Sequence, residues 1–243
     1  MNPTVSTAFT TTRWTQLMEA VRPDSADGQE AFAQLYVDYW PPLYSYVRKR
    51  GFAPTDAEDI TQDFFVALLA KQRLAGLTRD GGRFRSFLLA ALKNHLANAW
   101  NHAHTARRGG GQAALPLDLA EAESGYAAGF ATEPDAERVF ARQWAQTLVE
   151  RVRRRLETES ATTGKGKLFA ALRGQLQGDG GGRPYAELAP ELGLSEGALK
   201  VAAHRLRHRF GELLREEVTR TVADPTEVQQ ELRELIVLLG ETG

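Results

Sequence analysis

The chain has 243 residues, a formal net charge of −1 and no cysteine. A chain of this length suits two domains of about 100 residues each, and we expect two small domains. Without cysteine it forms neither a disulfide nor a thiolate metal site, which favours a reducing compartment, the cytoplasm. No apolar run approaches membrane-spanning length, and the first twelve residues lack the basic start and apolar core of a signal peptide.

Apolar residues recur at helical spacing along most of the chain, so the expected fold class is all-α. A first helix is predicted over residues 14–21. A second is predicted over residues 32–50, with a bend at Pro41 and Pro42. Its last turn is basic and Gly51 follows, a pattern that is typical of a helix end.

Residues 56–69 predict a third helix whose two faces require different partners. Ile60, Phe64 and Leu68, with Ala57 beside them, form an apolar stripe that suits a core. A separate acidic stripe consists of Asp56, Asp59 and Asp63. The helix dipole favours acids only within the first turn, so it does not account for the whole stripe. The acidic stripe is therefore either a solvated surface or a docking face for a basic partner.

Residues 83–100 predict a fourth helix with one apolar side. Its other side and the following residues carry amides that suit base edges and cations that suit phosphates. The amides are Asn94, Asn98 and Asn101, and the cations are Arg83, Arg85, Lys93, Arg107 and Arg108. The rings of Phe84 and Trp100 suit either base stacking or a core.

Residues 109–133 are rich in glycine and alanine, show no helical period and predict a linker. A second domain is predicted to begin at Pro134 with a helix. The apolar stripe of that helix is Val139, Phe140, Trp144, Leu148 and Val152. A shorter helix is predicted over residues 167–176. The glycine run that follows lacks the ending of a phosphate-binding loop and predicts a flexible turn.

Residues 184–218 have the spacing of a helix-turn-helix, set by Ala189, Gly193 and Leu199. Ser195 is the predicted N-cap of the second helix. The outward positions of that helix suit a major groove, and they are Lys200, His204, Arg205, Arg207, His208 and Arg209. The two histidines lie one turn apart, but with no third ligand in view they suit a solvated or phosphate-facing pair better than a metal site.

A last helix is predicted to start at Asp224 and Pro225. Its apolar stripe is Val228, Leu232, Leu235, Ile236 and Leu239. Such a stripe requires a packing surface. The helix is therefore either a built-in modulator packed on one of the two domains or a structural cap on the second domain.

The order of these parts resembles the extracytoplasmic-function sigma factors, the two-domain group of bacterial RNA polymerase sigma subunits. The segment DAEDITQDF, residues 56–64, is very close to the family's segment that docks on the clamp helices of polymerase. The segment from Phe84 to Arg108 is similar to the part that opens and reads the minus-ten element. Residues 185–209 are similar to the family's helix-turn-helix for the minus-thirty-five element, although Ala202 and Ala203 depart from its usual residues.

The resemblance implies three sets of contact residues. Polymerase-binding residues are Asp56, Glu58, Asp59, Gln62 and Asp63. Minus-ten contacts are Arg83, Arg85, Lys93, Asn94, Asn98, Asn101, Arg107 and Arg108. Minus-thirty-five contacts are Ser195, Glu196, Lys200, His204, Arg205, Arg207 and Arg209. The implied organisation is a region-two-like domain at residues 13–108, a linker at 109–133, a region-four-like domain at 134–220 and an added helical extension at 221–243.

The implied function is a promoter-specificity subunit that binds core RNA polymerase and promoter DNA, with an anti-sigma or other regulatory protein as a further partner. It implies no catalytic residue, no cofactor, no metal and no insertion into a membrane. Two alternatives stay open. One is a sigma-like regulator that occupies DNA or polymerase without starting transcription. The other is a metal-dependent nuclease using Asp59 and Asp63, for which no matched histidine or further acid is in view.

Overall fold

The structure, a computed structural model of the chain, describes residues 26–70, 82–103, 122–124, 126–127, 130, 133–177 and 182–240. These residues form helices, with no strand beyond an isolated bridge between Arg83 and Val222. The predicted all-α class is thereby confirmed. The chain divides into two compact units, which are described separately. The first unit is Met1–Thr147 with Thr219–Gly243, and the second unit is Leu148–Val218.

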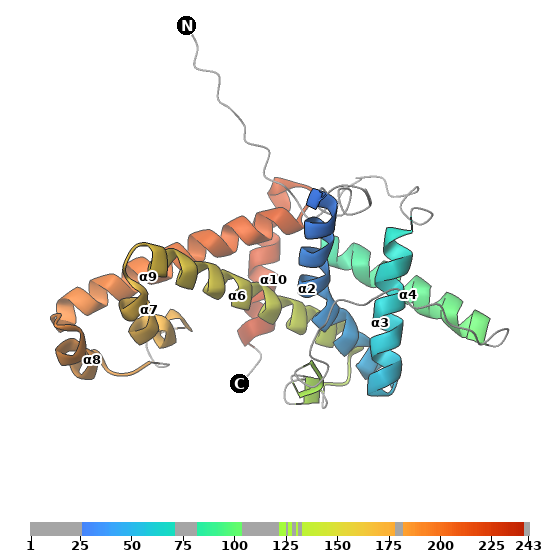
Figure 1. Cartoon of the computed structure of the whole chain (residues 1–243), viewed down its shortest axis with the longest axis horizontal. Coiled ribbons are helices and arrows are strands. Elements are labelled where there is room, and N and C mark those ends of the chain that lie inside the picture. The colour runs from blue at the N-terminus through green and yellow to red at the C-terminus, as the bar shows by residue number, and fades with distance from the viewer. Residues whose placement is uncertain are drawn as a thin grey trace, which may run out of the picture. The chain divides into compact units, whose positions relative to one another are not determined.

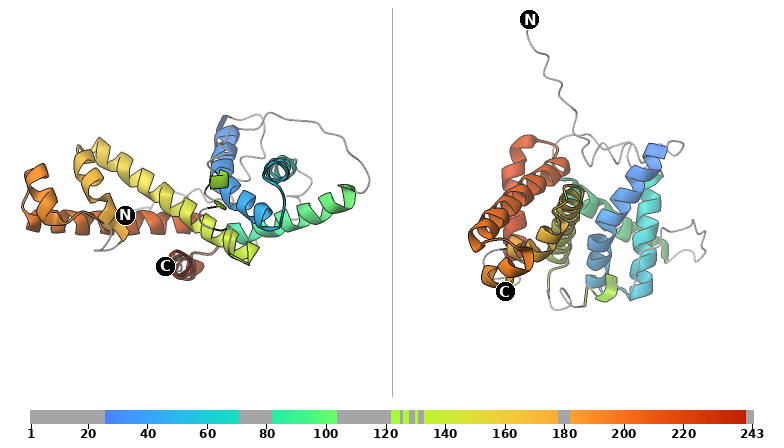
Figure 2. Two further views of the ribbon diagram at one scale, coloured as in Figure 1. Left: turned by 90° about the horizontal axis from the view of Figure 1, so that it is seen from below. Right: turned by 60° about the vertical axis from the view of Figure 1, so that its left-hand side comes forward.

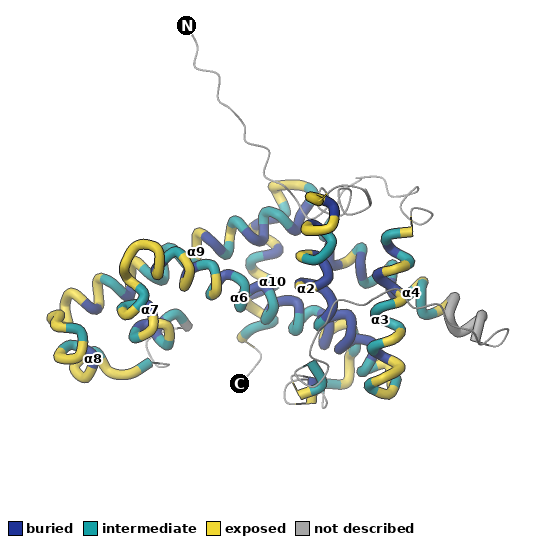
Figure 3. Tube along the Cα trace, viewed as in Figure 1, coloured by how far each residue is buried: buried dark blue, intermediate teal, exposed yellow. Residues whose placement is uncertain are grey.

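The first unit is built around α2 (Ala26–Lys49). The middle of this helix is dark blue in Figure 3, because side chains such as Trp40 and Tyr44 are almost completely buried. Pro41 and Pro42 lie inside the helix and supply no backbone N–H to its ladder. The extensive burial around them offsets the lost hydrogen bonds, and the helix continues through both prolines.

Helix α3 (Pro54–Leu69) lies beside α2 (Figures 1 and 2). Aromatic rings join the two helices. The centroid of the Phe65 ring lies 4.8 Å from that of Tyr36 and 6.1 Å from that of Phe32. Burial in this contact raises the pKa of Tyr36 to about 12. The packing fixes which face of α3 is turned inward.

Helix α4 (Phe84–Ala103) contributes the third part of this core. Phe84 and Leu88 are buried, and the ring of Phe84 meets Tyr39 edge to face at 5.2 Å. The core interpretation of Phe84 therefore holds. The side chain of Trp100 lies outside the described residues.

Part of the stretch predicted as a linker packs on α2. The Glu123 carboxylate accepts hydrogen bonds from the Tyr44 hydroxyl at 2.6 Å and from Nε and Nη2 of Arg48 at 2.8 and 2.7 Å. The Arg48 guanidinium lies over the ring of Tyr126, and Phe130 is buried. Arg48 holds the pKa of Glu123 below its ordinary value. The described residues of this stretch are thus attached to the first unit.

The C-terminal segment also belongs to the first unit. A 3-10 turn, η3 (Pro225–Glu227), leads into α10 (Val228–Gly240). The Asp224 carboxylate accepts from the backbone N–H of Thr226 at 2.8 Å, which confirms the predicted helix start.

The predicted apolar stripe of α10 is only partly correct. Val228 and Leu235 are buried, but Ile236 is 63% exposed. Neighbouring residues on a helix point about 100° apart, so a narrow contact that buries Leu235 turns the next side chain toward solvent.

Helix α6 (Ala136–Thr162) begins in the first unit and enters the second. Its five predicted stripe residues, Val139 to Val152, are all buried. The second unit continues with α7 (Gly166–Leu172), η2 (Arg173–Gln177), α8 (Tyr185–Leu192) and α9 (Glu196–Thr221). Its small core consists of Leu172, Leu188, Leu199 and Ala203. In the ranges that the structure describes, none of the helices has the length and apolar composition needed to cross a bilayer.

Candidate functional site

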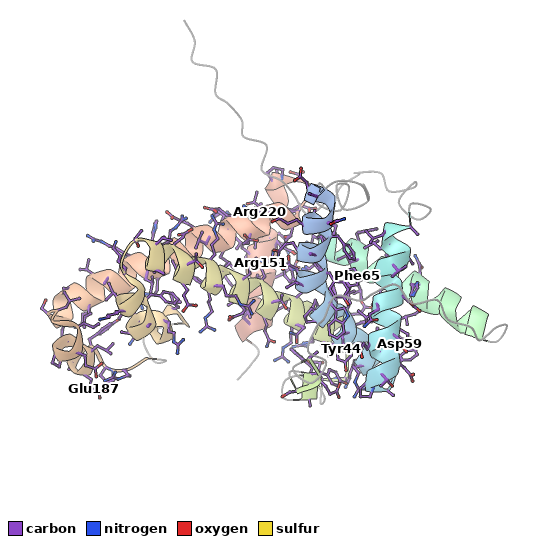
Figure 4. All side chains as sticks on the ribbon, in the orientation of Figure 1. Tyr44, Asp59, Phe65, Arg151, Glu187 and Arg220 are labelled. Atoms are coloured by element: carbon purple, nitrogen blue, oxygen red, sulfur yellow. The ribbon has the colours of Figure 1, made fainter. Side chains whose placement is uncertain are left out.

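Helix α3 has the two faces that its sequence predicts. Asp56, Asp59 and Asp63 are exposed, whereas Ala57 and Phe64 are buried. Figure 4 labels Asp59 and Phe65, which lie on different sides of the helix. The acidic stripe is therefore a surface of the first unit and not a group of paired core acids.

The buried face of α3 is broader than predicted. Phe65 is 2% exposed, while Ile60 is only half-buried. Thr61 is also buried, because its hydroxyl donates to the carbonyl of Ala57 at 2.6 Å and so needs no water. The outer face continues with Val66, which is 43% exposed. A single exposed apolar side chain is ordinary on a protein surface, so Val66 does not decide between a solvated face and a docking face.

Two further residues predicted to bind polymerase lie at the border between these faces. Glu58 and Gln62 are half-buried, and the Gln62 amide donates to the Glu58 carboxylate at 3.1 Å. This i, i+4 pair supports the helix, and the three exposed aspartates carry the charge that a partner would meet.

The polar side of α4 is described only in part. Asn94 is exposed, and Lys93 forms an ion pair with Glu137. Lys93 and Glu137 also line an open pocket of about 500 Å³, with Tyr46, Arg50, Phe52, Leu96 and Ala97. Asn98 and Asn101 lie on α4, but their side chains are outside the described residues, as are Arg107 and Arg108.

Arg83 and Arg85, at the start of α4, meet two carboxylates of α10. We call these four residues the arginine–glutamate cluster. Arg85 donates two hydrogen bonds to Glu231, from Nε at 2.6 Å and from Nη2 at 2.9 Å. Its Nη2 also donates to Glu234 at 2.8 Å. Arg83 pairs through Nε with Glu231 at 2.9 Å and through Nη2 with Glu234 at 2.7 Å. The Arg85 guanidinium also lies 4.7 Å from the ring centroid of Trp144.

The cluster has a buried part and a partly exposed part. The side chain of Glu231 is 0% exposed and that of Arg85 is 10% exposed, while Arg83 is 22% and Glu234 is 34% exposed. The hydrogen bonds from Arg83, with further contributions from Gln230 and Arg85, lower the pKa of Glu234 to about 2. The Glu234 carboxylate therefore faces the arginines as an anion at neutral pH. The Glu231 carboxylate is fully enclosed and contacts both arginines.

The helix-turn-helix in the second unit has the predicted turn and cap. Gly193 adopts a φ of +64°, and the N–H of Leu194 donates to the carbonyl of Ala189 at 3.1 Å. The Ser195 hydroxyl accepts from the N–H of Ala198 at 3.2 Å, so Ser195 is the N-cap of α9. Leu199 is completely buried against the first helix of the motif.

The outward residues of α9 fall into two groups. The exposed residues are Glu196, Lys200, His204, Arg205 and His208, and Nδ1 of His208 lies 3.3 Å from the Glu212 carboxylate. Arg207 and Arg209 are half-buried, and Arg209 donates through Nε and Nη2 to Glu159 of α6 at 2.9 and 3.0 Å. Arg209 also pairs with Glu212, and these acids raise its pKa further above its ordinary value. In the exposed group the cations Lys200 and Arg205 are open to a phosphate backbone.

Sequence reasoning named the arginines of these ion pairs but not their acidic partners. The Arg83–Glu234 pair joins residues 151 positions apart, and the Arg209–Glu159 pair joins residues 50 apart. No local spacing connects such residues. A weak signal was present, because Glu231 falls at helical spacing between Val228 and Leu235 on the side of α10 that becomes buried.

Searches for related proteins find no matching family model, no matching curated protein and no matching solved structure. Within the described part of the chain, no group of three or more histidines and acids is placed to hold a metal ion.

Proposed function

We propose that this chain is a promoter-specificity subunit of bacterial RNA polymerase, resembling the extracytoplasmic-function sigma factors. Two features of the chain, taken together, carry the proposal. One unit presents an exposed acidic stripe on α3, within a segment very close to the family's polymerase-docking motif. The other unit contains a capped helix-turn-helix with exposed cations. Either feature alone is common in proteins. The two features in this order along one chain are far more specific for the sigma-factor resemblance.

In this proposal α3 docks on core polymerase. Asp56, Asp59 and Asp63 meet a basic surface of the enzyme, and the aromatic contacts with α2 hold α3 rigid. A rigid charged face loses little side-chain and backbone freedom on binding, so it favours a specific complex.

The proposed division of DNA contacts follows the two regions of the resemblance. Lys200, His204 and Arg205 on α9 contact the upstream element in the major groove. Asn94 on α4, with the amides that follow it, reads bases of the melted downstream element. The region-two-like domain proposed at residues 13–108 lies within the first unit. The region-four-like domain proposed at 134–220 contains the whole second unit, together with residues 134–147 and 219–220, which belong to the first unit. The proposal assigns no bond-making or bond-breaking step to the chain itself.

Run-off transcription with bacterial core RNA polymerase tests this proposal. Genomic DNA fragments bound by the chain in cells serve as templates, and the expected result is specific initiation that depends on the added chain. Polymerase or DNA binding without any run-off product would instead identify a regulator that occupies these partners without starting transcription. Absence of binding to both would contradict the proposal.

A further inference from the structure

The C-terminal helix α10 places carboxylates where the first unit would be expected to offer its arginines to DNA. We propose that α10 is an intramolecular competitor of nucleic acid, and that Glu234 occupies Arg83 until a phosphate of the bound strand displaces it. This inference rests on the proposed function, because it concerns the minus-ten contacts that the function requires.

The chemistry of the occupied groups supports the competition. A guanidinium presents its N–H donors as a rigid planar fork, which fits a carboxylate and a phosphate with the same bidentate geometry. In the structure the forks of Arg83 and Arg85 are directed at Glu231 and Glu234. A donor that is aimed at a carboxylate oxygen cannot serve a phosphate oxygen at the same time.

In this cluster the Glu234 carboxylate can leave while the Arg85–Glu231 pair stays. Glu231 is completely buried against Arg85, which in turn lies over Trp144, so this inner pair fixes α10 in place. Removing one member of a buried pair leaves an uncompensated charge, and exchange there is strongly disfavoured. Glu234 and Arg83 lie at the edge of the cluster and are 34% and 22% exposed. Exchange is therefore easiest at the contact between Glu234 and Arg83, which we call the outer pair. Displacing Glu234 also breaks its 2.8 Å contact with Nη2 of Arg85, while Nε of Arg83 keeps its 2.9 Å contact with Glu231.

Two other contacts keep the start of the C-terminal segment attached when the outer pair opens. The N–H of Ala223 donates to the carbonyl of Gly82 at 3.3 Å, and Arg83 forms an antiparallel bridge with Val222. Leu235 and Val228 add buried apolar contacts. A competitor that stays tethered rebinds at a high effective concentration, so it lowers the apparent affinity for DNA without abolishing it.

The test compares Glu234→Gln with Glu30→Gln in the full-length chain, alone and with core RNA polymerase. Glu30 is exposed on α2, so this control loses the same charge elsewhere on the first unit. The probe is a short fluorescein-labelled single-stranded DNA, and the readout is fluorescence anisotropy at several salt concentrations. If the outer pair is closed about nine-tenths of the time, Glu234→Gln binds roughly tenfold more tightly. The salt slope should become steeper by about one unit, because one cation becomes available to phosphate.

The outcomes distinguish a failure of the competitor role of α10 from a failure of the proposed function. Tighter binding and a steeper slope for Glu234→Gln, with Glu30→Gln equal to the native chain, support the competitor. Equal binding by all three proteins overturns the competitor and leaves the proposed function standing. Absence of DNA binding by all three, even with core polymerase, overturns the proposed DNA contacts and the competitor together.

Discussion

At the scale of single residues, the three exposed aspartates of α3 are the sharpest test of docking. We predict that Asp59→Arg combined with Asp63→Arg leaves the unfolding temperature nearly unchanged, because both side chains are exposed, yet weakens binding to core polymerase by at least about a hundredfold. Asp27→Arg on α2 is the matched control, since Asp27 is also exposed. Equal affinity of all these proteins in a pull-down or titration would remove the docking interpretation.

Two cations of α9 should respond differently to removal. Lys200 is exposed, so Lys200→Ala should lower the salt slope of duplex binding by about one unit without changing stability. Arg209 is engaged by Glu159, so Arg209→Ala should instead lower the free energy of unfolding by about 0.5 to 1 kcal/mol, a small value because the pair is more than a third exposed. DNA titrations and urea unfolding of both variants check this. A full salt-slope change in Arg209→Ala would show that Arg209 leaves Glu159 to contact DNA.

At the scale of elements, we predict that alanine has opposite effects on stability at two glycines of the helix-turn-helix region. Gly193 has a φ of +64° at the end of α8, so Gly193→Ala should destabilise the second unit by about 1 to 2 kcal/mol. Gly211 lies inside α9 with open space around its Cα, so Gly211→Ala should stabilise the helix by up to about 1 kcal/mol. Thermal unfolding measures both. The same sign for the two variants would contradict the assigned turn.

The success of sequence reasoning at this scale depended on how local the determining contacts are. The stripe of α6 and the turn at Gly193 follow from spacing within one or two helical turns, and both are confirmed. The inward turn of Phe65 and the outward turn of Ile236 depend on the angle at which a neighbouring helix packs. The acidic partners of Arg83 and Arg85 depend on a chain segment about 150 residues away. Tertiary packing decided these features, and helical period alone could not predict them.

At the scale of the whole molecule, both units contain carboxylates whose pKa is lowered by arginine. Hydrogen bonds from Arg48, Arg209 and Arg83 lower the pKa of Glu123, Glu159 and Glu234 respectively, the last to about 2 from an ordinary value of 4.5. A carboxylate with a lowered folded-state pKa contributes stability that is present above its unfolded pKa and lost as pH falls through its folded pKa.

We therefore predict that the unfolding temperature is nearly constant from neutral pH to about pH 5 and falls steeply between about pH 4.5 and 2. Glu234→Gln should show a shallower fall, since glutamine has no proton to gain, whereas Glu30→Gln should follow the native curve. Calorimetry across this range makes the comparison. A native curve that is flat down to pH 2 would mean that these ion pairs contribute nothing measurable.

The membership of α10 in the first unit also sets an order of events during synthesis on the ribosome. The helices α2, α3 and α4 leave the ribosome long before Glu234, which follows Arg83 by 151 residues. At ordinary rates of translation this interval is roughly 8 to 30 s. During that time the nascent first unit has its acidic stripe on α3 but lacks the carboxylates that later cover its arginines. The first unit can therefore be completed only after the second unit has been made.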